Sequence, residues 1–247
     1  MKIENRIKYI SKWISDYSKK LPQQPSTLVV GVSGGIDSAV TSTLCAQTGI
    51  KTIVVSMPIK QNQDQHSLSI THIEWLKSKY NNVISYIINL DNVFKSFQDI
   101  MSEFENDLAY ANSRSRMRMV TLYQIAQSNR GIVVGTGNKV EDFGIGFYTK
   151  YGDGGVDISP IADCTKTQVW EMGKKLGINN EIVEAKPTDG LWDDARNDED
   201  QIGLSYPQIE EAMNNNTSEF YEKYLQIRKP NIHKMKSIPV CILPKKL

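Results

Sequence analysis

The chain has 247 residues, enough to bury a substantial core in one large α/β domain or two small ones. Its 29 Lys and Arg residues balance 28 Asp and Glu residues, which leaves no basic surplus for nucleic acid, and no apolar stretch approaches the length of a membrane span. The three cysteines, Cys45, Cys164 and Cys241, are widely spaced, so we expect a cytoplasmic protein without disulfides or a cysteine-based metal site, and without nucleic-acid or membrane partners.

The first half of the sequence predicts helices that alternate with short apolar strands. An amphipathic helix opens the chain and passes through Trp13 and Ile14, and a breaker at 22–26 follows it. The elements expected next are, in order, a strand at 27–33, a helix at 36–47, a strand at 52–57, a helix near 68–79, a strand at 83–88, two helical stretches of which the longer covers 107–128, and a strand at 132–134. Continuous apolar strands of this kind are typical of a parallel sheet with helices on both faces.

The second half of the sequence has a different texture. A glycine-rich loop occupies 151–157, a helix is predicted at 165–176, an acidic stretch lies at 192–200, and a last helix is predicted at 217–228, before Pro230. No repeat and no domain linker is evident. We therefore predict the α/β class, with an open, Rossmann-like parallel sheet covered by helices on both faces, in a single domain spanning residues 1–247.

The most informative segment follows the first strand and precedes a helix. It is composed of Gly31, Val32, Ser33, Gly34, Gly35, Ile36, Asp37 and Ser38. Glycines allow a close approach of the backbone to a ligand, and a helix N-terminus offers unpaired N–H groups to an anion. The serine hydroxyls add donors, and a carboxylate in such a loop suits a magnesium ion bound to phosphate. The segment predicts a pyrophosphate-binding loop.

Other phosphate-binding patterns fit this segment less well. No Lys follows the glycines as in a P-loop, and the G-x-G-x-x-G spacing of a dinucleotide-binding turn is absent. An ordinary strand-to-helix turn built from small residues is the remaining alternative. The segment resembles the signature of the N-type ATP pyrophosphatases, which split ATP into AMP and pyrophosphate.

Several further segments narrow this resemblance to one family. In chain order they are ANSRSRM at 111–117, GTGNKVE at 135–141, FYTK at 147–150 running into YGDGGVD at 151–157, DCTKT at 163–167, KPT at 186–188 and IGLSY at 202–206. Together with the loop at 31–38, this order resembles the ammonia-dependent NAD synthetases over nearly the whole chain.

The resemblance implies an ATP site and a metal site. Thr136, Lys166 and Thr188 would bind ATP together with the eight residues of the loop at 31–38. Asp37 and Glu141 would be the ligands of Mg²⁺, which prefers hard oxygen donors. The alternative for Glu141 is a solvated loop carboxylate, but its position directly after a Gly-rich turn that follows a core strand favours the metal ligand. The alternative for Lys166, a surface lysine at the start of a helix, fits the sequence nearly as well.

The resemblance also implies a site for deamido-NAD. The residues at the family's positions are Arg114, Lys150, Asp157, His233 and Lys234. Deamido-NAD carries a pyrophosphate and a carboxylate, for which cationic partners are the expected kind. Asp153, in the glycine-rich loop, is the candidate for the catalytic carboxylate that takes a proton from ammonium.

The activity implied is the amidation of deamido-NAD to NAD with ammonia, ATP as co-substrate and Mg²⁺ as cofactor. It would proceed through an adenylate and release AMP and pyrophosphate in the last step of NAD biosynthesis. We expect no glutaminase domain, because 247 residues leave no room for one, and a homodimer with the substrate at an interface formed partly by the helix at 107–128.

Three other functions remain as alternatives. A tRNA-thiolating enzyme would have paired cysteines and a basic face, and the synthetase module of GMP formation lacks a segment such as FYTKYGDGG. A non-catalytic sensor of adenine nucleotides would bind ATP without turnover, and Asp37 together with Glu141 weighs against it.

Overall fold

The structure is a computed structural model that describes residues 1–60, 63–188 and 197–243. Its centre is a four-stranded sheet with the strand order β3-β2-β1-β4. The strands are β1 (Thr27–Gly31), β2 (Lys51–Ser56), β3 (Val83–Ile87) and β4 (Gly131–Val133), and all neighbours pair in parallel. The sheet order places the carboxyl ends of β1 and β4 side by side, which is where ligands bind in open α/β sheets.

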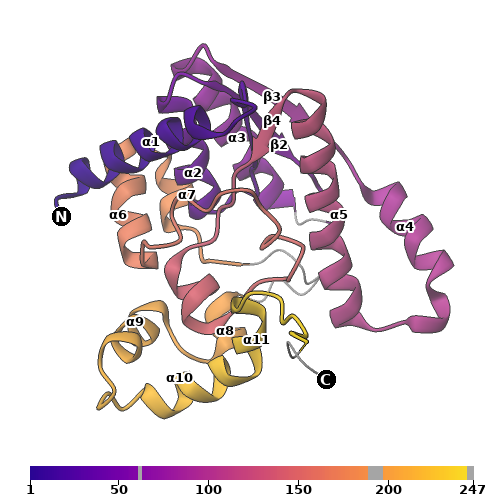
Figure 1. Ribbon diagram of the computed structural model, residues 1–247, viewed down its shortest axis with the longest axis vertical. Helices are drawn as coiled ribbons and strands as arrows, with labels where there is room; N and C mark the ends of the chain where they lie inside the picture. The colour runs from indigo at the N-terminus through magenta and orange to yellow at the C-terminus, as the bar shows by residue number, and fades with distance from the viewer. Residues whose placement is uncertain (61–62, 189–196, 244–247) are drawn as a thin grey trace.

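Helices cover both faces of this sheet, as predicted (Figure 1). On one face, Leu28 and Val30 are covered by four helices, namely α1 (Ile3–Lys20), α2 (Ile36–Gln47), α6 (Lys166–Leu176) and α7 (Asn180–Glu184). Helix α3 (Gln63–Lys79) packs over Val54 on the same face. On the other face, α4 (Asp91–Ile100) and α5 (Asp107–Ser128) pack over Val29, Ile53 and Val55, with η1 (Ser102–Phe104) between the two helices. Leu28 and Val30 face one core and Val29 faces the other, which explains why these three successive residues are all apolar.

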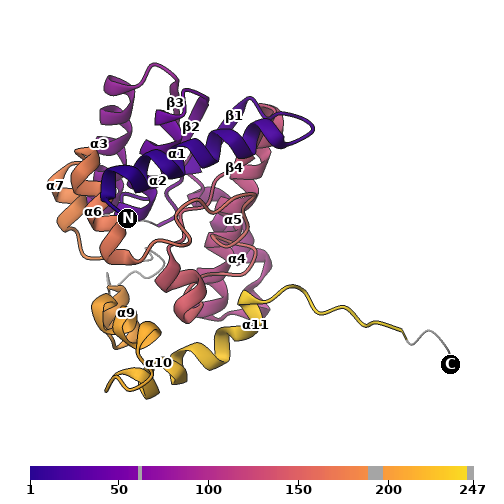
Figure 2. The same cartoon turned by 60° about the vertical axis from the view of Figure 1, so that its left-hand side comes forward.

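A helical layer lies below the sheet in Figure 1. It contains η2 (Val140–Ile145), α8 (Asp198–Ile202), α9 (Tyr206–Asn214), α10 (Tyr221–Arg228), η3 (Lys229–Asn231) and α11 (Ile232–Met235). Its own core includes Ile145, Tyr206 and Ile209, and Trp170 of α6 packs against both this core and the core beneath α2. Beyond α11, the segment 236–243 leaves the body in an extended path (Figure 2).

Most predicted elements agree with the structure, but α3 begins at Gln63 rather than near residue 68, and helices α7, α8, α9 and α11 were not predicted. Strand β1 and helix α10 differ from the prediction for identifiable reasons. Helices α2 and α5 have the predicted bounds. Strand β1 ends at Gly31, because only the N–H of Val32 continues the ladder, to the carbonyl of Val55, before the loop turns away. Helix α10 begins at Tyr221 instead of residue 217, since Asn215 accepts hydrogen bonds from the N–H and hydroxyl of Thr217 and forms a turn there.

Three further points complete the comparison with the sequence. The π-helical turn η2, directly after the GTGNK segment, was not predicted. Within the three described ranges, no helix is long and apolar enough to cross a membrane. Of the acidic stretch at 192–200, residues 192–196 lie outside the described part of the chain.

Candidate active site

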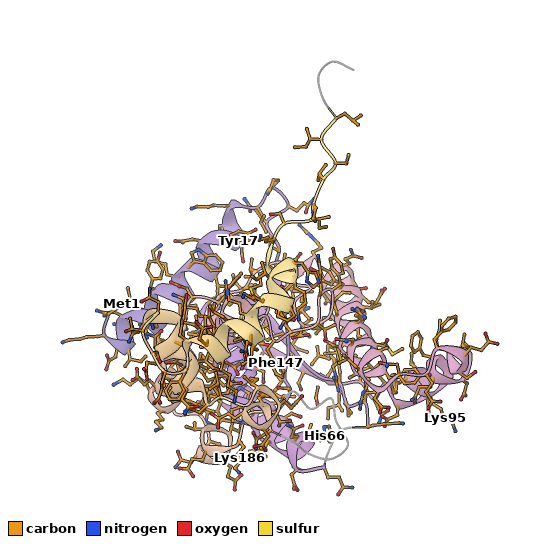
Figure 3. All side chains as sticks on the ribbon, turned by 90° about the horizontal axis from the view of Figure 1, so that it is seen from below. Met1, Tyr17, His66, Lys95, Phe147 and Lys186 are labelled. Carbon is orange, nitrogen blue, oxygen red and sulfur yellow. The ribbon has the colours of Figure 1, made fainter. Side chains whose placement is uncertain are left out.

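A cavity of about 560 Å³ opens at the carboxyl ends of β1 and β4. Its lining includes every residue that was predicted to bind ATP, namely residues 31–38, Thr136, Lys166 and Thr188. Glu141, Asp153 and Lys234 also line it. Phe147, another lining residue, lies near the middle of the molecule when it is seen from below, whereas Lys95 of α4 lies at the far edge (Figure 3).

Hydrogen bonds of a serine hydroxyl fix the conformation of the loop between β1 and α2. The Ser38 hydroxyl accepts a hydrogen bond from the N–H of Ser33 at 3.2 Å and donates one to the carbonyl of Gly35 at 2.9 Å. Gly34 has a φ of +95°, and a Cβ atom there would lie 2.4 Å from the carbonyl oxygen of Gln65 in α3. Only glycine fits this position, so the loop lies directly against α3 and leaves the N-terminus of α2 facing the cavity.

Beside this loop, Lys166 joins two carboxylates that are far apart in the sequence. Its Nζ donates to Asp37 Oδ2 at 2.6 Å and to Glu141 Oε1 at 2.9 Å. The Lys166 side chain is only 3% exposed, and those of Asp37 and Glu141 are 17% and 16% exposed. Lys166 is therefore not a surface lysine, and Glu141 is not a solvated loop carboxylate.

Neighbouring groups fix the two carboxylates. Asn138 donates to Asp37 Oδ1 at 3.0 Å, and the fully buried Tyr206 donates through its hydroxyl to Glu141 Oε1 at 2.6 Å. Burial raises the pKa of Asp37 against the effect of Lys166. Burial also favours a higher pKa for Glu141, but the charge of Lys166 and the hydrogen bond from Tyr206 outweigh it, so the pKa of Glu141 is lowered. Burial by itself would lower the pKa of Lys166, but the two neighbouring carboxylates outweigh it, so the pKa is raised and the amino group stays protonated.

Two more carboxylates line the cavity in different environments. Asp153 Oδ1 accepts hydrogen bonds from the Ser115 hydroxyl at 2.8 Å and from the N–H of Thr149 at 2.9 Å, so this side chain ties the glycine-rich loop to α5. Desolvation at the cavity wall raises the pKa of Asp153, and these donors oppose the rise. Asp142, on η2, has its pKa raised to about 8 by burial and by the nearby charges of Glu141 and Asp153.

The residues predicted to bind deamido-NAD are not brought together in this single chain. Lys234 lines the cavity and donates to the carbonyl of Tyr148 at 2.9 Å. Arg114 is buried over the ring of Phe94, and Asp157 accepts from the Tyr123 hydroxyl and from the N–H of Val133. The other two, Lys150 and His233, do not line the cavity; the Lys150 ammonium lies over the Tyr151 ring, and the exposed His233 contacts the carbonyl of Pro230.

Sequence reasoning assigned no role to three residues that shape the site. Asn138 and Tyr206 orient the acidic pair, which is Asp37 and Glu141. Asp142 adds a carboxylate to the wall of the cavity. Asn138 and Tyr206 both stand in segments that carried the family resemblance, GTGNK and IGLSY, and this was the available signal for them. For Asp142 the signal was its position directly after Glu141.

The donor chemistry of Asp37 and Glu141 fits magnesium. Mg²⁺ is commonly held by one or two carboxylates together with substrate phosphates, and both carboxylates here face one cation position beside the loop. Among the described residues, no group of three or more His, Cys, Asp or Glu side chains could hold a metal ion by itself.

Comparisons with known proteins agree with this geometry. The model of the NAD synthase family matches residues 6–241. An NH(3)-dependent NAD(+) synthetase of Carboxydothermus hydrogenoformans is 34% identical over 218 residues, with 85% of each chain covered, and one of Thermoplasma acidophilum is 36% identical over 229 residues, covering 90% of this chain and 92% of the relative.

Solved structures show the same fold. The NMN synthetase of Francisella tularensis has a TM-score of 0.88 and 31% identity, with 99% of both chains covered. The NH3-dependent NAD synthetase of Campylobacter jejuni has a TM-score of 0.79 at 22% identity, covering 98% of this chain and 100% of that one, which supports the fold alone. From the family match and these identities together, the chain belongs to the NAD synthase family.

Proposed function

We propose that this protein is a ligase that amidates deamido-NAD to NAD with ammonia, at the expense of ATP, and releases AMP and pyrophosphate. Membership in the NAD synthase family supports this activity. The observation that carries the proposal is that Asp37 and Glu141 lie together beside the loop at 31–38, where both accept hydrogen bonds from Lys166. We also propose that residues 1–247 act as a single synthetase domain that takes ammonia without a glutaminase domain.

In this proposal the loop at 31–38 and the N-terminus of α2 bind the ATP phosphates, assisted by Thr136, Lys166 and Thr188. Asp37 and Glu141 hold Mg²⁺, which offsets the negative charge of the phosphates when it is bound. The placement of Asp37 and Glu141 in the wall of the cavity that the loop at 31–38 also lines supports both assignments.

The chemistry requires two displacements. A carboxylate oxygen of the nicotinate attacks the α-phosphorus of ATP, and pyrophosphate leaves toward the loop at 31–38, where backbone N–H groups and the Lys166 ammonium stabilise its charge. Ammonia then attacks the acyl carbon of the adenylate, and AMP departs with the former carboxylate oxygen. Ammonium must lose a proton first, and we assign this step to Asp153, whose raised pKa improves it as a base.

The residues proposed for deamido-NAD fit a site shared between two chains. Lys234 reaches the cavity, whereas Arg114, Lys150, Asp157 and His233 lie outside its lining. We propose a homodimer in which a second copy completes the site. Apolar side chains exposed along α4, η1 and α5 support this, with Ile100 75%, Phe104 73%, Leu108 60% and Val120 61% exposed. Helix α5 forms one wall of the cavity through Leu108, and the arm of α4 and η1 projects beyond it (Figure 1).

The test of the dimer is sedimentation of the purified protein over a dilution series. A Val120→Glu variant, which puts a charge on the exposed face of α5, is expected to sediment as a monomer and to lose activity. Full activity in a wild-type monomer would reject the shared site.

The test of the activity measures pyrophosphate and NAD formation from ATP and MgCl₂, with deamido-NAD present or absent and with ammonium or glutamine. We expect both products only with deamido-NAD and ammonium. ATP binding without pyrophosphate release would favour a nucleotide sensor. Cytoplasmic location is a further proposal, which cell fractionation tests.

A second candidate substrate follows from one specific observation. The similarity to the Francisella tularensis NMN synthetase extends over 99% of both chains at 31% identity. The same chemistry on the mononucleotide, nicotinic acid mononucleotide, would give NMN. Running the assay with each substrate at equal concentration decides between them, because the preferred one has the higher kcat/KM.

A further inference from the structure

The Lys166 ammonium lies between the two carboxylates of the candidate metal site, Asp37 and Glu141. Lys166 Nζ donates to one oxygen of Asp37 and one oxygen of Glu141, at 2.6 Å and 2.9 Å. The ammonium group is nearly buried and lies 4.7 Å from the centroid of the Tyr206 ring, which adds a cation–π contact. Two largely buried carboxylates without a counter-ion would be strongly unfavourable, and the Lys166 ammonium neutralises them.

This arrangement conflicts with a metal ion on the same two oxygens. Magnesium binds carboxylate oxygen at about 2.0–2.1 Å, which would put it within contact distance of the Lys166 ammonium. Two cations that close in a partly dehydrated site repel each other strongly. The amino group must therefore move away before a divalent ion binds the same two oxygens, Asp37 Oδ2 and Glu141 Oε1.

The direction in which Lys166 could leave is set by the cavity. Lys166 lines the same cavity as the loop at 31–38, and its stem extends from the first residue of α6. That helix is fixed by a capping box between Thr165 and Gln168, so the backbone is held while the four-carbon side chain can turn. The triphosphate of ATP is the anionic partner that the proposed function supplies on that side.

We propose that Lys166 occupies the divalent-cation position in the nucleotide-free enzyme, so that Asp37 and Glu141 accept a divalent ion only together with nucleotide phosphates, to which the lysine transfers its hydrogen bonds. The inference rests on the proposed function for the identity of the nucleotide. It adds that metal and nucleotide enter together, and that an internal lysine enforces this coupling.

The experiment measures Mn²⁺ binding by the loss of the free-ion electron paramagnetic resonance signal, without nucleotide, because Mn²⁺ accepts the same oxygen ligands as Mg²⁺. Wild type is compared with Lys166→Met, which keeps the stem and removes the charge. Lys139→Gln is the matched control, since Lys139 forms an exposed pair with Asp163 at 2.9 Å, outside the cavity. We expect Lys166→Met to bind one Mn²⁺ about tenfold or more tightly than wild type, and Lys139→Gln to behave as wild type.

Two additions keep the result decisive. Adding Asp37→Asn to Lys166→Met should abolish the gained site, and MgCl₂ should raise the melting temperature of Lys166→Met while leaving wild type unchanged. If Lys166→Met is too unstable to purify, Lys166→Gln takes its place in both measurements. Wild-type protein that binds Mn²⁺ through Asp37 without nucleotide overturns the inference, and so does a Lys166 variant that binds no better than wild type.

The outcome is independent of the overall reaction. An enzyme that makes no NAD but gains Mn²⁺ binding in Lys166→Met rejects the proposed function and leaves the coupling intact. An active enzyme whose nucleotide-free wild type binds Mn²⁺ tightly rejects the coupling alone.

Discussion

Replacement of Tyr206 by Phe tests how the helical layer supports the acidic pair. The Tyr206 hydroxyl donates to Glu141 Oε1 at 2.6 Å and lies 3.1 Å from Asp198 Oδ2. Phe keeps the edge-to-face contact with Trp170, whose ring centroid is 5.9 Å away, and the contact with the Lys166 ammonium. The substitution thus removes little besides one buried hydrogen bond to a charged group.

The expected magnitude follows from that bond. A hydrogen bond to a charged group contributes about 1.5–3 kcal/mol, so Tyr206→Phe should lower the free energy of unfolding by roughly 2 kcal/mol. For a chain of this size the melting temperature should fall by about 4–8 °C. Glu141 also loses the donor that orients it, and we expect the Mg²⁺ concentration for half-maximal rate to rise by roughly tenfold, the factor that about 1.4 kcal/mol gives.

Tyr110→Phe is the matched control. Tyr110 also packs edge-to-face, on Phe94 at 6.1 Å, but its hydroxyl donates to a neutral carbonyl, that of Met101, at 3.2 Å. Its loss should destabilise by about 1 kcal/mol and leave the Mg²⁺ dependence unchanged. Urea unfolding and initial rates over a MgCl₂ series measure both quantities. Equal stability losses in the two variants, with wild-type Mg²⁺ dependence in Tyr206→Phe, would refute the role given to Tyr206.

Three more predictions test other parts of the structure. Gly34→Ala should abolish ATP binding in calorimetry, because its Cβ would lie 2.4 Å from the carbonyl oxygen of Gln65 at a φ of +95°, and wild-type affinity would contradict the loop geometry. Asp153→Asn should lower the amidation rate at least about tenfold while the protein stays folded; an unchanged rate would show that Asp153 only ties the loop to Ser115. Burial lowers the pKa of His72 to about 4, from 6.5, so the unfolded state binds more protons between these values and stability should fall as the pH drops from about 6.5 to 4. His72→Gln removes this group and should show less loss in that window in urea unfolding at each pH; parallel curves would assign the loss elsewhere.

The sequence predicted those parts of the protein that depend on neighbouring residues. The bounds of α5 were predictable because Asn106 caps its first turn, accepting from the N–H of Ala109, and Asn129 caps its C-terminus. The turn at 31–38 was predictable because glycines between a strand and a helix favour a tight turn in which backbone N–H groups stay accessible. The same local chemistry supplied the candidate Asp37, whereas Glu141 came from the family resemblance.

The environment of those candidates depended on the tertiary structure. Lys166 and Asp37 are 129 positions apart, and the sequence left Lys166 as either an ATP ligand or an exposed residue at a helix start. Its burial between two carboxylates results from the packing of α6 against α2 and of α9 beneath them, where Tyr206 reaches Glu141. Likewise, Asp153 was predicted as a catalytic carboxylate from a loop, and only the fold placed Ser115 against it. The sequence by itself determined which residues could bind phosphate and metal, because that is a property of each side chain and its neighbours in the chain. Only the tertiary structure decided which charges meet and which are shielded from water, because burial and pairing arise when distant segments pack together.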